Sequence, residues 1–214
     1  MNDPDDKTQR AESMDFVFVG EALALDLVNT DVVLRGKRHD FLSVPEDARC
    51  WWDEATLHHP GREVVEGEAE TTCWDAELLD ALKQLRAALR SLFLALIERQ
   101  PIQRHDLEVL NQAAAGDRQL AIGSDGTLIP VYRTRMPATG AILLPIAFSA
   151  LQLITESERE RLRKCDNESC SCMALFYDTT RNATRRWCSS NCMHRSRSRE
   201  RYRREKEALA GAQR

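Results

Sequence analysis

The sequence predicts an α+β fold that is mainly helical: a helical N-terminal domain with a small β-hairpin, plus a small treble-clef-like zinc module at the C-terminus. Three observations predict it. Leucines recur at helical spacing between residues 75 and 100, two short alternating runs flank a turn between residues 119 and 133, and five of the seven cysteines fall within residues 165–192. The 214 residues are enough for one large domain and a small appendage.

Short secondary-structure elements are predicted in the N-terminal third of the chain. Residues 1–14 are polar and acidic, which is typical of a disordered start, and residues 16–20 resemble a short strand followed by a helix over residues 21–29. A second short helix is expected to begin at Pro45, because proline suits the first helical position. Residues 58–72 are rich in glutamate and lack an apolar period, so we expect an exposed loop.

The middle of the chain carries the main helices. The strongest covers residues 75–100 and is ended by Pro101, and a shorter one covers residues 106–115. Two runs around a Gly-Ser-Asp-Gly-Thr turn, together spanning residues 119–133, predict a β-hairpin. The last core helix is expected over residues 140–164, where it changes from apolar to strongly charged.

This change in composition marks a domain boundary. The predicted organisation is a disordered segment 1–14, a regulatory domain 15–160 and a zinc module 161–214. Residues 1–154 carry 15 Lys and Arg against 25 Asp and Glu, a net charge of −10, whereas residues 155–214 carry 15 against 9, a net charge of +6. The total of −4 therefore conceals a local basic patch that suits a polyanionic partner.

The cysteines predict a structural zinc site that holds one ion per chain. No export signal or apolar stretch of transmembrane length is visible, so we expect a cytoplasmic protein with reduced thiols and no membrane partner. Two close cysteine pairs separated by a loop suit tetrahedral zinc coordination. The favoured ligands are Cys165, Cys170, Cys188 and Cys192. Cys172 is the alternative to Cys170, and His194 is a further competitor.

The geometry expected around the zinc ion follows from the spacing. Cys188 and Cys192 are four residues apart and would share one face of a helix that begins near Ser189. Cys165 and Cys170 would form a knuckle at the end of the preceding helix, followed by a short strand over residues 174–177. A segment this short, with few large apolar side chains, depends on the metal for its folding free energy.

These residues resemble the CGNR zinc finger, a module at the C-terminus of bacterial transcriptional regulators. The resemblance is carried by Cys165-x4-Cys170, Phe176-x-Asp178, Arg181-Asn182, Arg185-Arg186-Trp187-Cys188 and Cys192-x-x-Arg195. Residues 16–30 resemble the start of the ABATE domain that accompanies this finger. The resemblance implies a mainly helical N-terminal domain, bound zinc, and DNA binding in stress-related transcription. Where the signature reads Cys-Gly-Asn-Arg, this chain has Cys-Met-His-Arg at 192–195, so no role of the Gly or Asn carries over.

An arginine-rich helix is expected from residue 190 to about 209. Some arginines would offset the negative charge of a zinc ion with four thiolates, and the others would bind DNA, since the guanidinium fork suits phosphate and guanine. The candidate DNA-binding residues are Arg181, Arg185, Arg186, Arg195, Arg197, Arg199, Arg201 and Arg204. Glu200 and Glu205 are placed to form i,i+4 ion pairs with Arg204 and Arg201. A solvated helix without a partner is the plainer interpretation.

No sequence pattern of an enzyme is present: the chain lacks a glycine-rich phosphate loop and a G-x-S-x-G elbow. Asp26, Asn29 and Thr30 are candidates for lining a pocket for a small-molecule effector, although Asn29 and Thr30 also suit a helix end. The sequence thus favours a DNA-binding transcription regulator whose N-terminal domain senses a signal or mediates homodimerisation. A zinc-stabilised protein-interaction adaptor and an RNA-binding protein are the alternatives.

Overall fold

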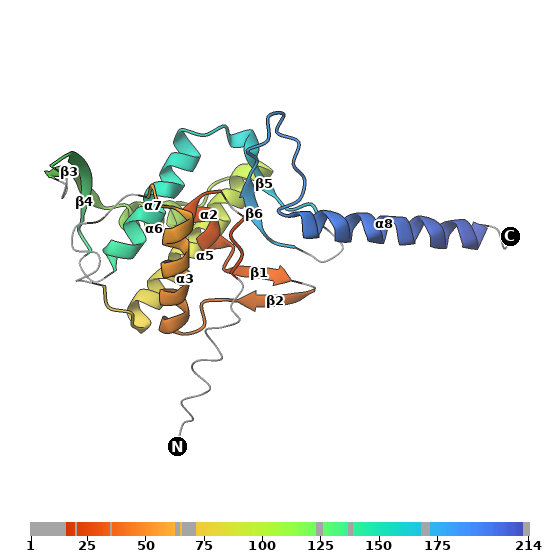
Figure 1. The fold of residues 1–214 in the computed structure, drawn as a ribbon, viewed down its shortest axis with the longest axis horizontal. Coiled ribbons are helices and arrows are strands. Elements are labelled where there is room, and N and C mark those ends of the chain that lie inside the picture. Colours follow the sequence, from red (N-terminus) through yellow and green to blue (C-terminus); the bar gives the residue numbers. More distant parts are fainter. Residues whose placement is uncertain are drawn as a thin grey trace, which may run out of the picture.

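The computed structural model describes residues 16–19, 21–34, 36–62, 65, 72–122, 126–136, 139–167 and 172–211. The predicted disorder of residues 1–14 lies outside these ranges. A helical body occupies the centre of the molecule, a β-hairpin protrudes at one end, and a long C-terminal helix projects from the other end (Figure 1). The predicted fold class, mainly helical with small β-hairpins, is confirmed.

The predicted central helix is α5 (Ala76–Glu98). Its leucine stripe is buried because it faces the other helices, and Asp75 begins the helix by accepting a hydrogen bond from the Leu78 N–H at 3.0 Å. Helix α5 ends at Arg99, whose φ of 55° is left-handed. Pro101 follows two residues later and disfavours a helical conformation at Gln100, which agrees with the predicted end.

The other helices of the body pack around α5. They are α2 (Leu23–Val28), α3 (Pro45–His58), α6 (Arg104–Ala113) and α7 (Gly140–Thr155). All six residues of α2 are buried, because this short helix lies against both α5 and α7. Together these elements enclose the main core, rich in leucine and tryptophan. None of the helices in the described ranges has the length and apolar character needed to cross a bilayer.

Two antiparallel hairpins belong to this body. Strands β3 (Gly116–Ile122) and β4 (Leu128–Thr134) confirm the predicted hairpin and lengthen it, with Leu120 opposite Pro130 and Ile122 opposite Leu128. Strands β1 (Asp31–Leu34) and β2 (Lys37–Asp40) form a second hairpin that the sequence did not predict. All four residues of β2 are charged or polar and exposed, so no alternation of apolar side chains signals this strand.

The predicted helix over residues 140–164 is wrong in its second half. Helix α7 ends at Thr155, and the charged segment continues as a 3₁₀ turn η1 (Arg159–Arg161) and strand β5 (Leu162–Lys164). Strand β5 pairs antiparallel with β6 (Leu175–Tyr177), which confirms the short strand predicted there. Leu162 and Leu175 are both buried in the main core, and this burial favours the strand pair over an exposed helix.

The strand predicted at residues 16–20 is also wrong, since residues 16–19 belong to no sheet. Their alternation has another cause. Phe16 and Phe18 pack against the main core, whereas Val17 and Val19 pack against a second cluster built around the C-terminal cysteines. An extended segment between two apolar clusters places successive side chains on opposite sides, which imitates the pattern of a strand.

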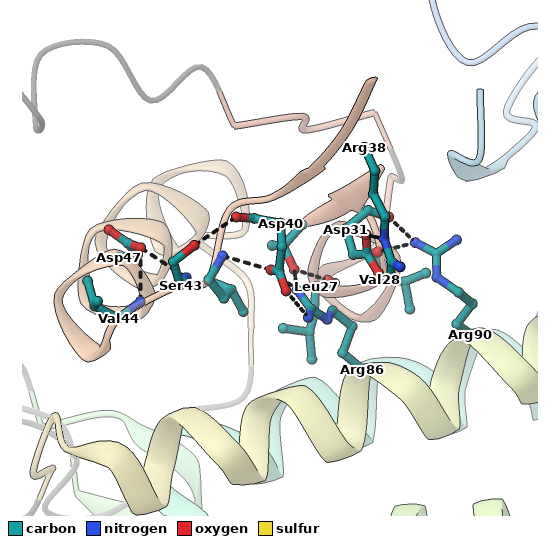
Figure 2. Close-up of polar contacts among 12 residues, drawn as sticks. Leu27, Val28, Asp31, Arg38, Asp40, Ser43, Val44, Asp47, Arg86 and Arg90 are labelled. Atoms are coloured by element: carbon teal, nitrogen blue, oxygen red, sulfur yellow. Dashed lines mark hydrogen bonds and ion pairs between the residues drawn. The ribbon is translucent and has the colours of Figure 1, made fainter. Parts of the chain in front are cut away.

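A partly buried polar network joins α5 to the β1–β2 hairpin, and Figure 2 shows its arginines rising from that helix. Arg86 binds both carboxylate oxygens of Asp40, at 2.6 and 2.8 Å, and also donates to the Thr30 hydroxyl. Burial acts to raise the pKa of Asp40, but the hydrogen bonds from Arg86 and from the Leu42 N–H leave that pKa below its ordinary value. The network therefore stabilises the ionised carboxyl.

Replacing Arg86 with methionine is expected to lower the free energy of unfolding by about 2 kcal/mol. This loss lies below the usual 3–5 kcal/mol for a broken buried pair, because the Asp40 side chain is 39% exposed to solvent. Since the pKa of Asp40 is lowered by folding, its contribution is present above about pH 4 and is lost as the pH falls further. Urea unfolding at pH 7 and pH 3 should show a smaller pH effect in the variant; an equal pH effect in both proteins contradicts this role.

Candidate metal centre and basic helix

Four cysteine sulfurs meet at one point beside the β5–β6 pair. Cys165 follows β5, Cys172 precedes β6, and Cys188 and Cys192 flank the start of helix α8 (Ser190–Gly211). All four sulfurs lie within 4.8 Å of one another, with 3.7 Å between Cys172 and Cys188 and 3.5 Å between Cys188 and Cys192. Zn–S bonds of about 2.3 Å in a tetrahedron give sulfur separations of about 3.8 Å, so the donor set fits a zinc ion.

The sequence left Cys170, Cys172 and His194 as alternatives for one metal ligand. Among the described residues, Cys172 is the one whose sulfur lies with the other three. Cys170 lies outside the described residues, and His194 is exposed on α8. The β5–β6 ladder explains the position of Cys172. Lys164 pairs with Leu175, and the Cys165 N–H continues the ladder to the Ala174 carbonyl at 2.9 Å. Opposed residues share one face of a hairpin, and so do residues two apart, so Cys172 faces the same side as Cys165.

The surroundings exclude water from the sulfurs. The four cysteines are 2–5% exposed and pack against Val32, Ala174 and Phe176. Several polar groups approach the sulfurs. Among them, the Cys188 N–H donates to Cys165 Sγ at 3.4 Å, and Arg195 Nη2 donates to Cys192 Sγ at 3.5 Å. Donors of this kind stabilise thiolates. The prediction that part of the arginine cluster offsets sulfur charge is supported by Arg195.

The sulfurs also share protons. A hydrogen bond with Cys165 is the main cause that raises the pKa of Cys172 and of Cys188. Hydrogen bonds from neighbouring thiols lower the pKa of Cys165 and of Cys192. Four thiolates this close repel one another, so the group ionises fully only when a cation balances the charge. The donor chemistry and the geometry therefore agree on a soft divalent metal such as zinc.

The segment between β6 and Cys188 is held by Asp178, which is fully buried. Its Oδ1 accepts hydrogen bonds from the Thr180 N–H and hydroxyl, and its Oδ2 accepts one from the Arg185 N–H at 2.7 Å. These bonds lower the pKa of Asp178 against the opposing effect of burial. Asn167 completes the frame by donating to the Cys192 carbonyl at 2.8 Å. Each cysteine thus sits on a fixed backbone.

The N-terminal domain forms direct hydrogen bonds with the backbone near Cys172. The Asn29 amide, at the end of α2, donates to the Leu175 carbonyl at 2.8 Å and accepts from the Leu175 N–H at 2.9 Å. Arg90 of α5 donates to the Met173 carbonyl at 3.1 Å and to the carbonyls of Val28 and Asp31. Since Met173 is next to Cys172, helix α5 positions the loop that carries one of the sulfurs.

Helix α8 confirms the predicted basic helix and extends away from the body (Figure 1). Every side chain from residue 197 to 207 is exposed, so this part of the helix packs on nothing in the described chain. The predicted ion pairs are present: Arg204 meets Glu200, and Arg201 meets Glu205. Between residues 194 and 207, Tyr202 is the only apolar or aromatic side chain. The helix therefore has a charged surface without an apolar face.

Comparison with known families decides the assignment. The family model ABATE, described as a putative stress-induced transcription regulator, matches residues 21–157, which is more than half of the chain. The chain belongs to the ABATE family. The CGNR zinc finger model matches residues 161–205, a range that contains all four clustered sulfurs. The search of curated proteins found no match. The two family descriptions name regulation and zinc binding rather than a reaction.

In this ABATE protein the core is continuous between the two matched ranges. Leu162 and Leu175 of the CGNR finger lie in the main core, while Val32 of the ABATE range lies in the cysteine cluster. A treble-clef-like module that folds apart from the N-terminal domain would not share its core in this way. The finger is thus one part of a larger packed unit.

The arginines of the CGNR finger fall into two groups. Arg185 is held by the fold: it lies 4.6 Å above the Phe176 ring, pairs with Glu21 and donates to the Cys188 carbonyl. Arg186 pairs with Asp166. Arg195 donates to the Cys192 sulfur. The remaining candidates present their guanidinium groups to solvent on the loop or on the helix, and Arg197 lies 5.8 Å from the centroid of the Trp187 ring. The exposed candidates are Arg181, Arg197, Arg199, Arg201 and Arg204.

The three residues predicted to line an effector pocket use their polar groups for contacts within the protein. Asp26 lies 2.7 Å from the His59 ring, and Asn29 holds Leu175. The Thr30 hydroxyl donates to the Leu27 carbonyl at 2.7 Å and accepts from Arg86, so it satisfies the end of α2 as the plainer interpretation expected. All three side chains are buried and stabilise the fold.

Sequence reasoning missed Asp178 and Arg90 as determinants of the site. Asp178 precedes two threonines, and this pattern is typical of an Asx turn, so a local signal was present. Arg90 had no such signal. It lies in a regular amphipathic helix, and its acceptors are backbone carbonyls of residues 28, 31 and 173, far away in the sequence.

Proposed function

We propose that this ABATE protein is a zinc-dependent DNA-binding transcription regulator that uses helix α8 to contact DNA. The observation that carries the proposal is the exposed, arginine-rich surface of α8 beyond residue 196. Six arginines and Lys206 lie between residues 195 and 206, against Glu200 and Glu205. A polyanion is the partner that such a surface fits best.

As a binding partner for α8, a nucleic acid is energetically favoured over a protein with an apolar groove. A single helix of 22 residues in water is marginally stable, and packing of an apolar face normally supports it. Helix α8 has no such face, so a protein groove lined by apolar side chains gains little from it. At about 1.5 Å per residue the helix is about 33 Å long, enough to follow the major groove and meet phosphates along its length.

Bound zinc would be held by Cys165, Cys172, Cys188 and Cys192 as thiolates, and it would supply folding free energy to the finger. Cys192 lies in the first turn of α8, so this site fixes the direction in which the helix leaves the body. A reducing cytoplasm, as the sequence predicts, keeps the thiols available for the metal. Cys170 then has no role in coordination.

The N-terminal domain is proposed to regulate this DNA contact, by sensing a small molecule or by forming a homodimer, with the domain boundary near residue 160. Contacts that would transmit a conformational change from the N-terminal domain to the finger are present at two places. Asn29 and Arg90 hold the loop and strand next to Cys172, and Glu21 pairs with Arg185. A shift of α2 or α5 would therefore reach the backbone that orients α8.

The test compares two triple variants that lose equal charge from opposite faces of α8. At about 100° per residue, Arg197, Arg201 and Arg204 project away from the side of Cys192, whereas Arg199, Arg203 and Lys206 share that side. Alanine at the first three positions is expected to weaken binding to a pool of random 30-base-pair duplexes about 100-fold near 0.15 M salt. Alanine at the second three should weaken it less, because that face continues the side on which Cys192 is buried against the body.

Fluorescence anisotropy at several salt concentrations measures both effects. In the first variant the slope of log K against log salt should become shallower by about 2.7, since each phosphate contact contributes about 0.9. Zinc content and thermal unfolding should stay at wild-type values in both variants. Wild-type protein that fails to bind duplex DNA at low salt overturns the proposal. Tighter binding to single-stranded or duplex RNA would assign the helix to RNA instead.

A further inference from the structure

A basic hollow lies where the ABATE domain meets the CGNR finger. Its volume is about 1430 Å³, and it is bounded by the end of α5, by η1 and β5, and by the segment that leads into α8. Among the described residues that line it, six are basic: Arg99, Arg159, Arg163, Lys164, Arg185 and Arg186. Two are acidic, Glu160 and Asp166, and Asp166 already pairs with Arg186. The walls are strongly cationic, unlike the rest of the acidic N-terminal domain.

Three of these cations are available to a partner. Arg99, Arg159 and Lys164 are exposed, and none of them forms an ion pair with another described residue. Arg163 lies deeper: its Nη2 donates to the Ala183 carbonyl at 2.8 Å, while its buried Nε has no hydrogen-bond partner in the described part of the chain. Unpaired cations gathered on one concave surface repel one another, so a polyanion that binds there gains from relieving this repulsion.

The shape also points to a polymer. Small-molecule sites enclose roughly 300–1,000 Å³, whereas this hollow is larger and its charged lining is mostly basic. Arg185 and Arg186 line the hollow and also precede Cys188 and the start of α8. The hollow thus places basic residues at the end of α5, beside Cys165 and Cys172, and in the segment that leads into the helix. A nucleic acid strand bound to α8 would therefore lie close to this surface.

We propose that this hollow binds the phosphodiester backbone beside the segment that α8 contacts, so that the ABATE domain itself supplies a DNA contact through Arg99, next to Arg159 and Lys164. This inference rests on the proposed function and adds a second surface to it. Contacts to phosphates position a protein on DNA without reading its sequence. The hollow would thus fix the angle of α8 relative to the duplex, and the domain that holds the hollow would control that angle.

The experiment replaces Arg99, Arg159 and Lys164 together with alanine in the full chain and measures binding to the random 30-base-pair duplexes. We expect affinity near 0.15 M salt to fall at least 10-fold and the salt slope to become shallower by about 2 to 3. The matched control replaces Arg118, Arg133 and Arg135, which are exposed on and beside the β3–β4 hairpin at the end of the molecule opposite α8 (Figure 1). The control should bind within about 2-fold of wild type.

The outcomes separate the two proposals. If wild type binds no duplex, the proposed function itself fails. If wild type binds and the hollow variant binds equally well, the inference about the hollow fails while the role of α8 stands. Equal losses in the hollow variant and the control would reduce the effect to net charge and also overturn the inference. Should the triple variant lose zinc, the double variant R159Q/K164Q, which leaves the end of α5 intact, decides the same question.

Discussion

Replacing Cys172 with alanine is expected to abolish zinc binding and unfold the finger, whereas alanine at Cys170 is expected to leave zinc content and stability unchanged. The Cys172 sulfur lies 3.7 Å from that of Cys188 and is buried, as each ligand of a closed tetrahedral site must be. Structural zinc contributes about 10–16 kcal/mol in zinc-finger peptides, so this variant has the largest expected effect. The core shared by the two matched regions should spread the loss to the N-terminal domain.

Metal analysis of the purified full-length proteins measures the effect, together with thermal unfolding followed by circular dichroism. Wild type and the Cys170 variant should each hold one zinc per chain, and the Cys172 variant should hold close to none. Cys50→Ala is the control for loss of a thiol outside the cluster. The proposed ligand set is wrong if the Cys170 variant loses zinc while the Cys172 variant keeps it.

Replacing Asn29 with alanine is expected to cost about 4 kcal/mol of unfolding free energy. Asn29 is fully buried, and its amide satisfies both the N–H and the carbonyl of Leu175. Alanine leaves these two backbone groups buried without partners, at about 1–3 kcal/mol each, and adds a small cavity. Because Leu175 belongs to the strand that follows Cys172, the variant should also bind zinc more weakly.

Urea unfolding of the zinc-loaded proteins tests this role of Asn29. Asn182 is exposed on the loop before α8, so Asn182→Ala removes the same side chain where it has no buried partner, and a change within about 0.5 kcal/mol is expected. A loss below about 1 kcal/mol for Asn29→Ala would show that the Leu175 contacts contribute little. In that case the earlier hypothesis of a ligand-facing Asn29 would regain support.

Elements whose signal is local were predicted well from the sequence. The leucine period identified α5, the alternating runs identified the β3–β4 hairpin, and the polar helix α8 was identified with its ion pairs. The segment after Thr155 was not, because its charged residues suit an exposed helix as well as a strand. Burial of Leu162 against distant helices favours the strand, and no short window of sequence contains that information.

The helical domain, the cluster of metal-binding thiols and the basic helix could all be predicted from the amino-acid sequence, because each depends on residue types at short spacing. That Cys172 joins the other three sulfurs follows from the folded arrangement alone, since the register of β5 against β6 turns it toward Cys165. The shared core and the basic hollow also arise only on folding. Both bring together residues far apart in the chain, and packing of apolar side chains provides the free energy that holds them there.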